Sequence, residues 1–153
     1  FGSRTTLGEI GRTQKETRVL QVAAQSVCGR MAPPTQKSVS DSEWRKKLTP
    51  EAYRVLRRGG TEAPGRHEFN HFFPRKGYFA CAGCDFPLYS ANAKFVEHSG
   101  WPAWDKCFYS EEHGCHVGTR GELGGVEMHC NRCGGHLGHI FYGEGFTKTN
   151  ERH

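Results

Sequence analysis

Four of the seven cysteines form two CxxC pairs, a spacing typical of zinc knuckles. The first pair is Cys81 and Cys84, and the second is Cys130 and Cys133. Four thiolates would complete a closed tetrahedral site with no ligand position left for substrate, so we expect a structural Zn²⁺ ion. Two alternatives stay open: a redox dithiol, which favours a helix N-terminus in a βαβ setting that this sequence does not show, and four buried cysteines without metal.

The two pairs are 45 residues apart, against about 15–20 in a compact zinc ribbon. We therefore expect a subdomain between them, with Gly83 and Gly134 easing the two turns. The remaining cysteines are Cys28, Cys107 and Cys115. An odd total does not suit a secreted disulfide scaffold, so cysteine usage indicates a reducing intracellular compartment.

Two histidines, His136 and His139, follow the second pair. Imidazole titrates near neutral pH and suits proton transfer. In a regular strand the two side chains would face opposite sides, and spacing alone favours one surface and one core histidine. A bulge at Gly138 would bring both into one pocket.

The elements that must position these residues begin with two short helices. Ser40 and Glu43 fit a capping box, and Thr49-Pro50-Glu51 is a second start signal. Gly59 and Gly60 should end the second helix. Beyond Arg66 the helical period disappears and short β-like runs follow, at 77–80, 86–89, 126–130 and 136–142. The residues themselves predict a mainly β body with short N-terminal helices.

A length of 153 residues, 35% of them hydrophobic, suits one domain with an extension. No apolar run approaches the roughly 18 residues of a membrane-spanning helix, so we expect no membrane function. The net charge of +5 divides into +3 for residues 1–30 and +2 for the rest, which does not imply a nucleic-acid partner. Residues 1–39 are predicted to be a transit-like or disordered leader; a translated segment upstream of a start at Met31 is the alternative.

Several motifs around the CxxC pairs resemble the B-type peptide-methionine (R)-S-oxide reductases. They are Phe86-Pro87-Leu88-Tyr89-Ser90, Lys94-Phe95, Gly100-Trp101-Pro102-Ala103-Trp104 and Gly135-His136-Leu137-Gly138-His139-Ile140-Phe141. The resemblance covers about residues 42–153. It implies two antiparallel β-sheets braced by a four-cysteine zinc site, in an enzyme that reduces methionine-R-sulfoxide in proteins.

The resemblance also implies roles for individual residues. His136 and His139 would orient or supply the proton that the sulfoxide oxygen needs to leave. Trp101 would hold the substrate's methyl group against its flat apolar ring. Arg152 would stabilise the nucleophilic thiolate. Thioredoxin or a similar thiol would be the reductant. We expect the protein to be a monomer. We expect it in the cytoplasm, or in a mitochondrion or plastid if the leader is a transit peptide.

The family's nucleophile falls directly after the position of His153, the last residue printed. We expect a cysteine or selenocysteine there, and a UGA codon for selenocysteine is easily read as a stop. The alternatives are a sequence that was ended on purpose at this position and a truncated pseudoenzyme. The 153-residue chain as printed should bind zinc and lack turnover. Ser99 occupies the position of the resolving cysteine of many relatives, which leaves Cys28, Cys107 and Cys115 as candidate resolvers.

A rival interpretation is a catalytically dead zinc-ribbon-like module that binds protein or nucleic acid. It accounts for the CxxC pairs and the mild basicity, but it requires neither Trp101 nor the two histidines. Nucleic-acid binding also predicts a basic stripe with interleaved aromatic residues. The Lys and Arg residues gather instead at 45–47 and 54–58, which is more simply a solvated helix face.

Overall fold

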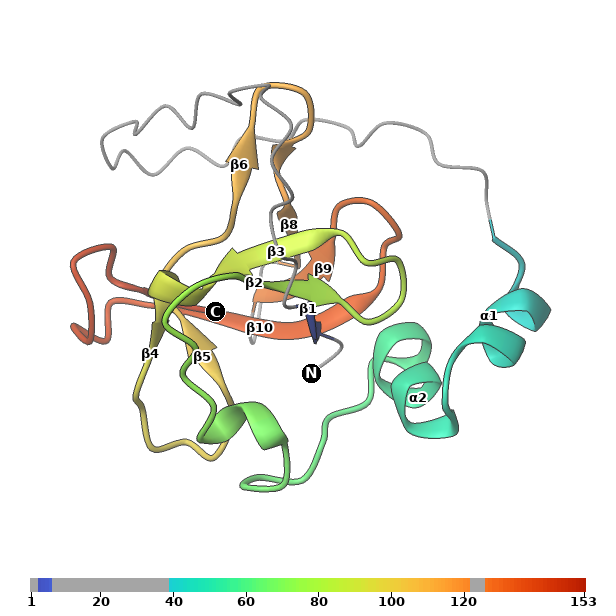
Figure 1. Ribbon diagram of the computed structural model, residues 1–153, viewed down its shortest axis with the longest axis horizontal. Helices are drawn as coiled ribbons and strands as arrows, with labels where there is room; N and C mark the ends of the chain where they lie inside the picture. Colours follow the sequence, from blue (N-terminus) through green and yellow to red (C-terminus); the bar gives the residue numbers. More distant parts are fainter. Residues whose placement is uncertain (1–2, 7–38, 122–125) are drawn as a thin grey trace.

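The computed structural model describes residues 3–6, 39–121 and 126–153 (Figure 1). Two larger antiparallel sheets form the body. One has the order β1-β2-β3, and the other has the order β11-β10-β9-β8. Two further pairs of short strands, β4-β5 and β6-β7, complete the described β structure. The predicted mainly β fold with two antiparallel sheets is confirmed.

The elements have the following bounds. The first sheet contains β1 (Ser3–Thr6), β2 (Tyr78–Cys81) and β3 (Pro87–Ser90). The second contains β8 (Val117–Arg120), β9 (Val126–Cys130), β10 (His136–Tyr142) and β11 (Glu151–Arg152). The short pairs are β4 (Lys94–Phe95) with β5 (Ala103–Trp104), and β6 (Tyr109–Ser110) with β7 (Gly114–Cys115). Two 3₁₀ turns, η1 (Glu68–Asn70) and η2 (Ala91–Ala93), precede β2 and β4.

Both predicted helices are present and begin at the predicted caps. In α1 (Asp41–Lys47), the Ser40 hydroxyl accepts from the backbone N–H of Glu43, and the Glu43 carboxylate accepts from that of Ser40. Helix α2 (Pro50–Arg58) begins after Thr49 and ends at Gly59 in a left-handed conformation. The polar faces of these helices point outward, while Trp44, Val55 and Leu56 are buried. In Figure 1 the two helices stand to one side of the sheets.

The core lies between the two sheets and contains side chains from both. Tyr89 stacks on Trp104 with ring centroids 4.7 Å apart, and the edge of Phe79 meets the same indole at 5.0 Å. The Tyr89 hydroxyl donates to Met128 Sδ on β9 at 3.8 Å. These four side chains are fully buried, so the first sheet, the β4-β5 pair and the second sheet share one core.

The predicted leader is described only in part. Its residues Ser3–Thr6 form β1, which pairs antiparallel with β2. Residues 1–2 and 7–38, and with them Cys28, lie outside the described residues. Among the described residues no helix is long and apolar enough to cross a membrane.

Candidate active site and metal centre

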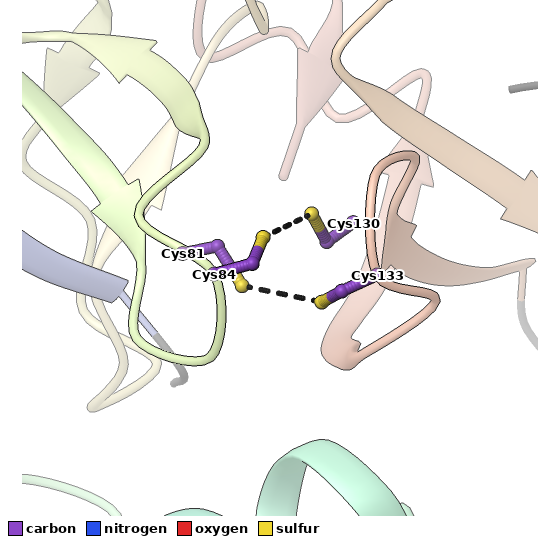
Figure 2. Close-up of side chains that lie close together, drawn as sticks. All are labelled: Cys81, Cys84, Cys130 and Cys133. Atoms are coloured by element: carbon purple, nitrogen blue, oxygen red, sulfur yellow. Dashed lines mark hydrogen bonds between the residues drawn. The ribbon is translucent and has the colours of Figure 1, made fainter. Parts of the chain in front are cut away.

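The four CxxC cysteines converge between the two sheets (Figure 2). Cys81 and Cys84 come from the end of β2, and Cys130 and Cys133 from the end of β9. Their four Sγ atoms all lie within 4.8 Å of one another. The Sγ atoms of Cys81 and Cys133 are 3.7 Å apart, and those of Cys84 and Cys130 are 3.6 Å apart. Tetrahedral Zn–S bonds of about 2.3 Å require sulfur separations of about 3.8 Å, so the four thiols fit a zinc ion.

The two knuckles have the same backbone turn. The N–H of Asp85 donates to the carbonyl of Cys81, and the N–H of Gly134 donates to that of Cys130, each at 2.8 Å. Asp85 and Gly134 are both left-handed, with φ of 57° and 68°. Gly134 has the positive φ of its turn, whereas Gly83 lies within the first turn without a positive φ. A Cβ at Gly83 would lie 3.5 Å from Leu56 and from Trp44, an ordinary van der Waals distance.

Helix α2 packs directly on the second knuckle. The guanidinium of Arg57 donates from both terminal nitrogens to the carbonyl of Cys133, at 2.8 and 3.1 Å. The same guanidinium lies 4.2 Å from the centre of the Trp44 ring. Arg57 therefore links α1, α2 and the metal centre. Its role was not evident from the sequence, where Arg57 belongs to an apparently solvated basic run.

The second part of the site is a pocket of about 210 Å³, and none of the four cysteines is among its described lining residues. It brings together every noncysteine residue predicted for the site. Its walls come from the end of α2 and the segment after it, from 97–102, from β10 and from β11. The predicted residues that line it are Trp101, His136, His139 and Arg152; among the others are Glu62, Glu97, Ser99, Phe141 and His153.

The predicted bulge brings the two histidines together. The register between β10 and β9 shifts between His136 and Gly138, and Gly138 has a φ of 145°. The two imidazole rings lie 5.7 Å apart and nearly perpendicular. His136 is buried, whereas His139 is exposed. One histidine is thus held within the protein while the other faces the pocket opening.

Glu127 of β9 holds His136 in place, a contact that was not predicted from the sequence. Its carboxylate lies 2.7 Å from His136 Nδ1, and on its other side it accepts two hydrogen bonds from Arg120, at 2.6 and 2.8 Å. The hydrogen bonds from Arg120 and then from His136 lower the pKa of Glu127 to about 2. Glu127 is therefore an anion near neutral pH and orients the imidazole. The feature that could have indicated this contact is the position of Glu127 in β9, the strand that pairs antiparallel with β10.

Backbone contacts fix the position of Trp101. Its indole N–H donates to the carbonyl of Glu62 at 2.9 Å, which ties the ring to the segment after α2. The preceding Gly100 has a φ of 96°, and its carbonyl accepts from the N–H of Gly65 at 2.7 Å and from the side chain of Asn70 at 3.0 Å. The indole is thereby held as a fixed wall of the pocket.

Arg152 is held by an ion pair at the pocket edge. It donates to both carboxylate oxygens of Glu144, at 2.6 and 2.8 Å, and its guanidinium lies 4.2 Å above the centre of the Phe141 ring. His153, which follows it, is buried and exchanges two backbone hydrogen bonds with Trp104, at 3.2 and 2.9 Å. This pairing anchors the residue after β11 against β5.

Ser99 and the candidate resolving cysteines fall in different places. Ser99 lines the pocket and bonds to the carboxylate of Glu97. Cys107 is a free thiol packed against the core, and burial raises its pKa. Neither Cys107 nor Cys115 is among the described residues that line the pocket.

The fold and the site together define a mainly β protein whose two sheets meet at four cysteines that could hold a metal ion, and which has a pocket with two histidines. Residues 48–153 match the family model of the SelR domain, and the chain belongs to that family. It is 45% identical over 128 residues to an uncharacterized protein of Schizosaccharomyces pombe, covering 78% of this chain and 86% of the relative. The resemblance to B-type reductases is confirmed.

Two plant relatives carry a functional name. Peptide methionine sulfoxide reductase B5 of rice is 49% identical over 119 residues, covering 76% of this chain and 84% of the relative. Peptide methionine sulfoxide reductase B2 of Arabidopsis thaliana, named as chloroplastic, is 45% identical over 122 residues, covering 78% of this chain and 58% of the relative.

Proposed function

We propose that this protein reduces methionine-R-sulfoxide in proteins to methionine. The observation that carries the proposal is the single pocket in which Trp101, His136, His139 and Arg152 meet. An apolar wall, two imidazoles and a guanidinium are the groups needed to bind a methyl sulfoxide, to protonate its oxygen and to stabilise a thiolate. Family membership and the names of the relatives support the same activity.

The proposed nucleophile is a cysteine or selenocysteine directly after His153. Its anion attacks the sulfoxide sulfur, and the oxygen passes to the nucleophile as a sulfenic or selenenic acid while methionine leaves. His139, exposed at the pocket, supplies the proton to that oxygen. His136, oriented by Glu127, positions the oxygen, and Arg152 stabilises the attacking anion. The indole of Trp101 receives the methyl group.

A dithiol such as that of thioredoxin completes the cycle. It reduces the sulfenic acid, releases water and becomes a disulfide. Because Ser99 occupies the position of a resolving cysteine, the reductant acts either directly or through another cysteine of the chain. Cys107, packed against the core and outside the pocket lining, is a poor internal resolver as placed here.

We assign a structural role to Zn²⁺ at the four cysteines. A bound ion would connect the end of β2 to the end of β9, one strand from each sheet. All four of its ligand positions would be taken by thiolates, so it would brace the fold and leave the chemistry to the pocket.

The test is the turnover of the chain extended by the expected nucleophile. A peptide containing methionine-R-sulfoxide should be reduced with thioredoxin and its reductase as electron source, and the S isomer should not. His139→Gln should lower kcat/KM by about 100-fold, the lower range for a lost general acid. His71→Gln, which alters an exposed histidine outside the pocket lining, is the matched control. Equal rates for the two variants would remove His139 from the mechanism, and no reduction of either isomer would reject the activity.

The rival binding module finds less support in the basic helices. Asp41 pairs with Arg45 and Arg58, and Glu51 pairs with Arg54. Much of the basic charge is thus matched locally. We propose a monomeric protein of the cytoplasm, or of a mitochondrion or plastid if its leader directs it there, that does not bind nucleic acid. A salt-sensitive affinity for DNA or RNA would favour the rival.

A further inference from the structure

Two exposed phenylalanines lie beside the pocket and have no function in the reaction proposed above. Phe141 is 44% exposed and lines the pocket, and Phe146, in the loop between β10 and β11, is 58% exposed. A third ring, Phe95 on β4, lies 6.2 Å from Phe146 between centroids. We refer to Phe95, Phe141 and Phe146 as the aromatic rim.

The rim meets the pocket at Phe141. Phe141 is opposite Arg152 in the β10-β11 register, and the Arg152 guanidinium covers one face of its ring. Glu144, which holds Arg152, lies in the same loop as Phe146. Phe95 is two residues from Glu97, another lining residue. A chain whose sulfoxide side chain enters the pocket would therefore run past these rings.

The charged groups of the pocket have intramolecular partners. Arg152 is the only Lys or Arg among the described lining residues, and Glu144 engages it through both oxygens. Glu97 accepts from the backbone and the hydroxyl of Ser99. No unpaired Lys or Arg among these described residues is available for the α-carboxylate of a free amino acid. The rim offers apolar surface instead, and its contact with apolar side chains lowers the free energy of the complex.

We infer that the aromatic rim is a docking surface for the residues flanking the oxidised methionine, and that it selects polypeptide segments with large apolar neighbours. This inference rests on the proposed function for its central residue. The occupant is a flexible or unfolded segment, because apolar residues on both sides of a methionine are accessible together mainly where a chain is not packed. The rings contact the neighbours, while Trp101 and the histidines receive the sulfoxide.

The test is a binding measurement with the 153-residue chain. Because this chain does not include the expected nucleophile, the peptides bind without being reduced. Two capped pentapeptides carry a central methionine-R-sulfoxide, one flanked by leucines and the other by serines; their unoxidised forms complete the set. Isothermal titration should show the leucine peptide binding at least about fivefold more tightly than the serine peptide, equivalent to about 1 kcal/mol. The double variant Phe141→Ala/Phe146→Ala should lose this preference and keep the sulfoxide preference.

Tyr109→Ala is the matched control, because Tyr109 is an aromatic residue of similar exposure, 65%, outside the pocket lining. It should retain the preference for leucine flanks. Equal binding of the two oxidised peptides, or a preference that persists in the folded double variant, would overturn the docking inference. Leucine-dependent binding that vanishes in the double variant but ignores oxidation would support the rim and count against the proposed function. Circular dichroism verifies the folding of each variant.

Discussion

At the scale of single residues, two charged side chains have contrasting environments. Glu127 is an anion held between Arg120 and His136, and its pKa falls to about 2. Lys94 is buried on β4, and desolvation lowers its pKa to about 8. Its ammonium lies 3.7 Å from the centre of the Phe73 ring, a cation–π contact, and no ion pair of Lys94 is found among the described residues. The charge on Glu127 orients a pocket histidine, whereas the buried charge on Lys94 lowers the stability of the folded state.

The stability of the protein should therefore depend on the protonation of Lys94. Between pH 8 and 10.5 the folded state has released the Lys94 proton while the unfolded state still holds it, so rising pH favours folding. Over this range the native protein should gain on the order of 2 kcal/mol relative to Lys94→Met, which has no group to titrate there. Urea unfolding of both proteins at about pH 7, 8, 9 and 10 measures the difference. Parallel pH profiles would show that Lys94 keeps its proton in the fold.

At the scale of elements, helix α2 connects the metal centre to the pocket. Arg57 near its end contacts the carbonyl of Cys133, and Val55 lines the pocket. The segment that follows supplies the Glu62 carbonyl, which binds the indole of Trp101. The position of the pocket wall thus depends on how α2 sits against the second knuckle.

Removal of Arg57 should loosen the metal centre. Arg57→Ala leaves the part-buried carbonyl of Cys133 without its two donors, a cost near the lower end of the about 1–3 kcal/mol of a buried unsatisfied acceptor. We expect zinc to transfer to a coloured chelator several-fold faster than from the native protein. Arg58→Ala is the control, since Arg58 is exposed and pairs only weakly, at 3.4 Å, with Asp41. Equal transfer rates for the two variants would contradict the role of Arg57.

At the scale of the whole molecule, the four cysteines connect two sheets that have no strand pairing with each other among the described residues. The described β2 pairs only within the first sheet, and β9 only within the second. Their shared core contains Phe79 and Tyr89 from one side and Met128 from the other. A metal ion would add a covalent-like link where the two strands end.

Zinc removal should destabilise both sheets together. Structural zinc contributes about 10–16 kcal/mol of apparent binding free energy in small zinc peptides. Even a fraction of this, lost from a 153-residue protein, should lower Tm by about 10 °C or more. Thermal melts followed by circular dichroism, before and after a strong chelator and again after zinc is restored, measure the effect. An unchanged Tm in protein shown by elemental analysis to be metal-free would reject the bracing role.

The local features of this protein could be predicted from its amino-acid sequence. The caps at Ser40 and Thr49, the four longer predicted strands and the doubled CxxC depend on neighbours a few residues away, and each was predicted close to its observed place. The two-residue strands β4 to β7 and β11 were not predicted, because so short a run has no visible alternation, and the four-residue strands β1 and β8 were not predicted either. Trp101, His136, His139 and Arg152 received their roles only through the family resemblance.

Which distant groups meet depends on the tertiary packing. Arg57 and Cys133 are 76 positions apart, and Trp101 and the Glu62 carbonyl are 39 apart. The bond between Glu127 and His136 depends on the bulge that shifts β10 against β9. Such contacts follow from the packing of sheets and helix around one core, which no local pattern encodes. The residue types for binding zinc and moving a proton were therefore readable in the chain, while their orientation came from the fold.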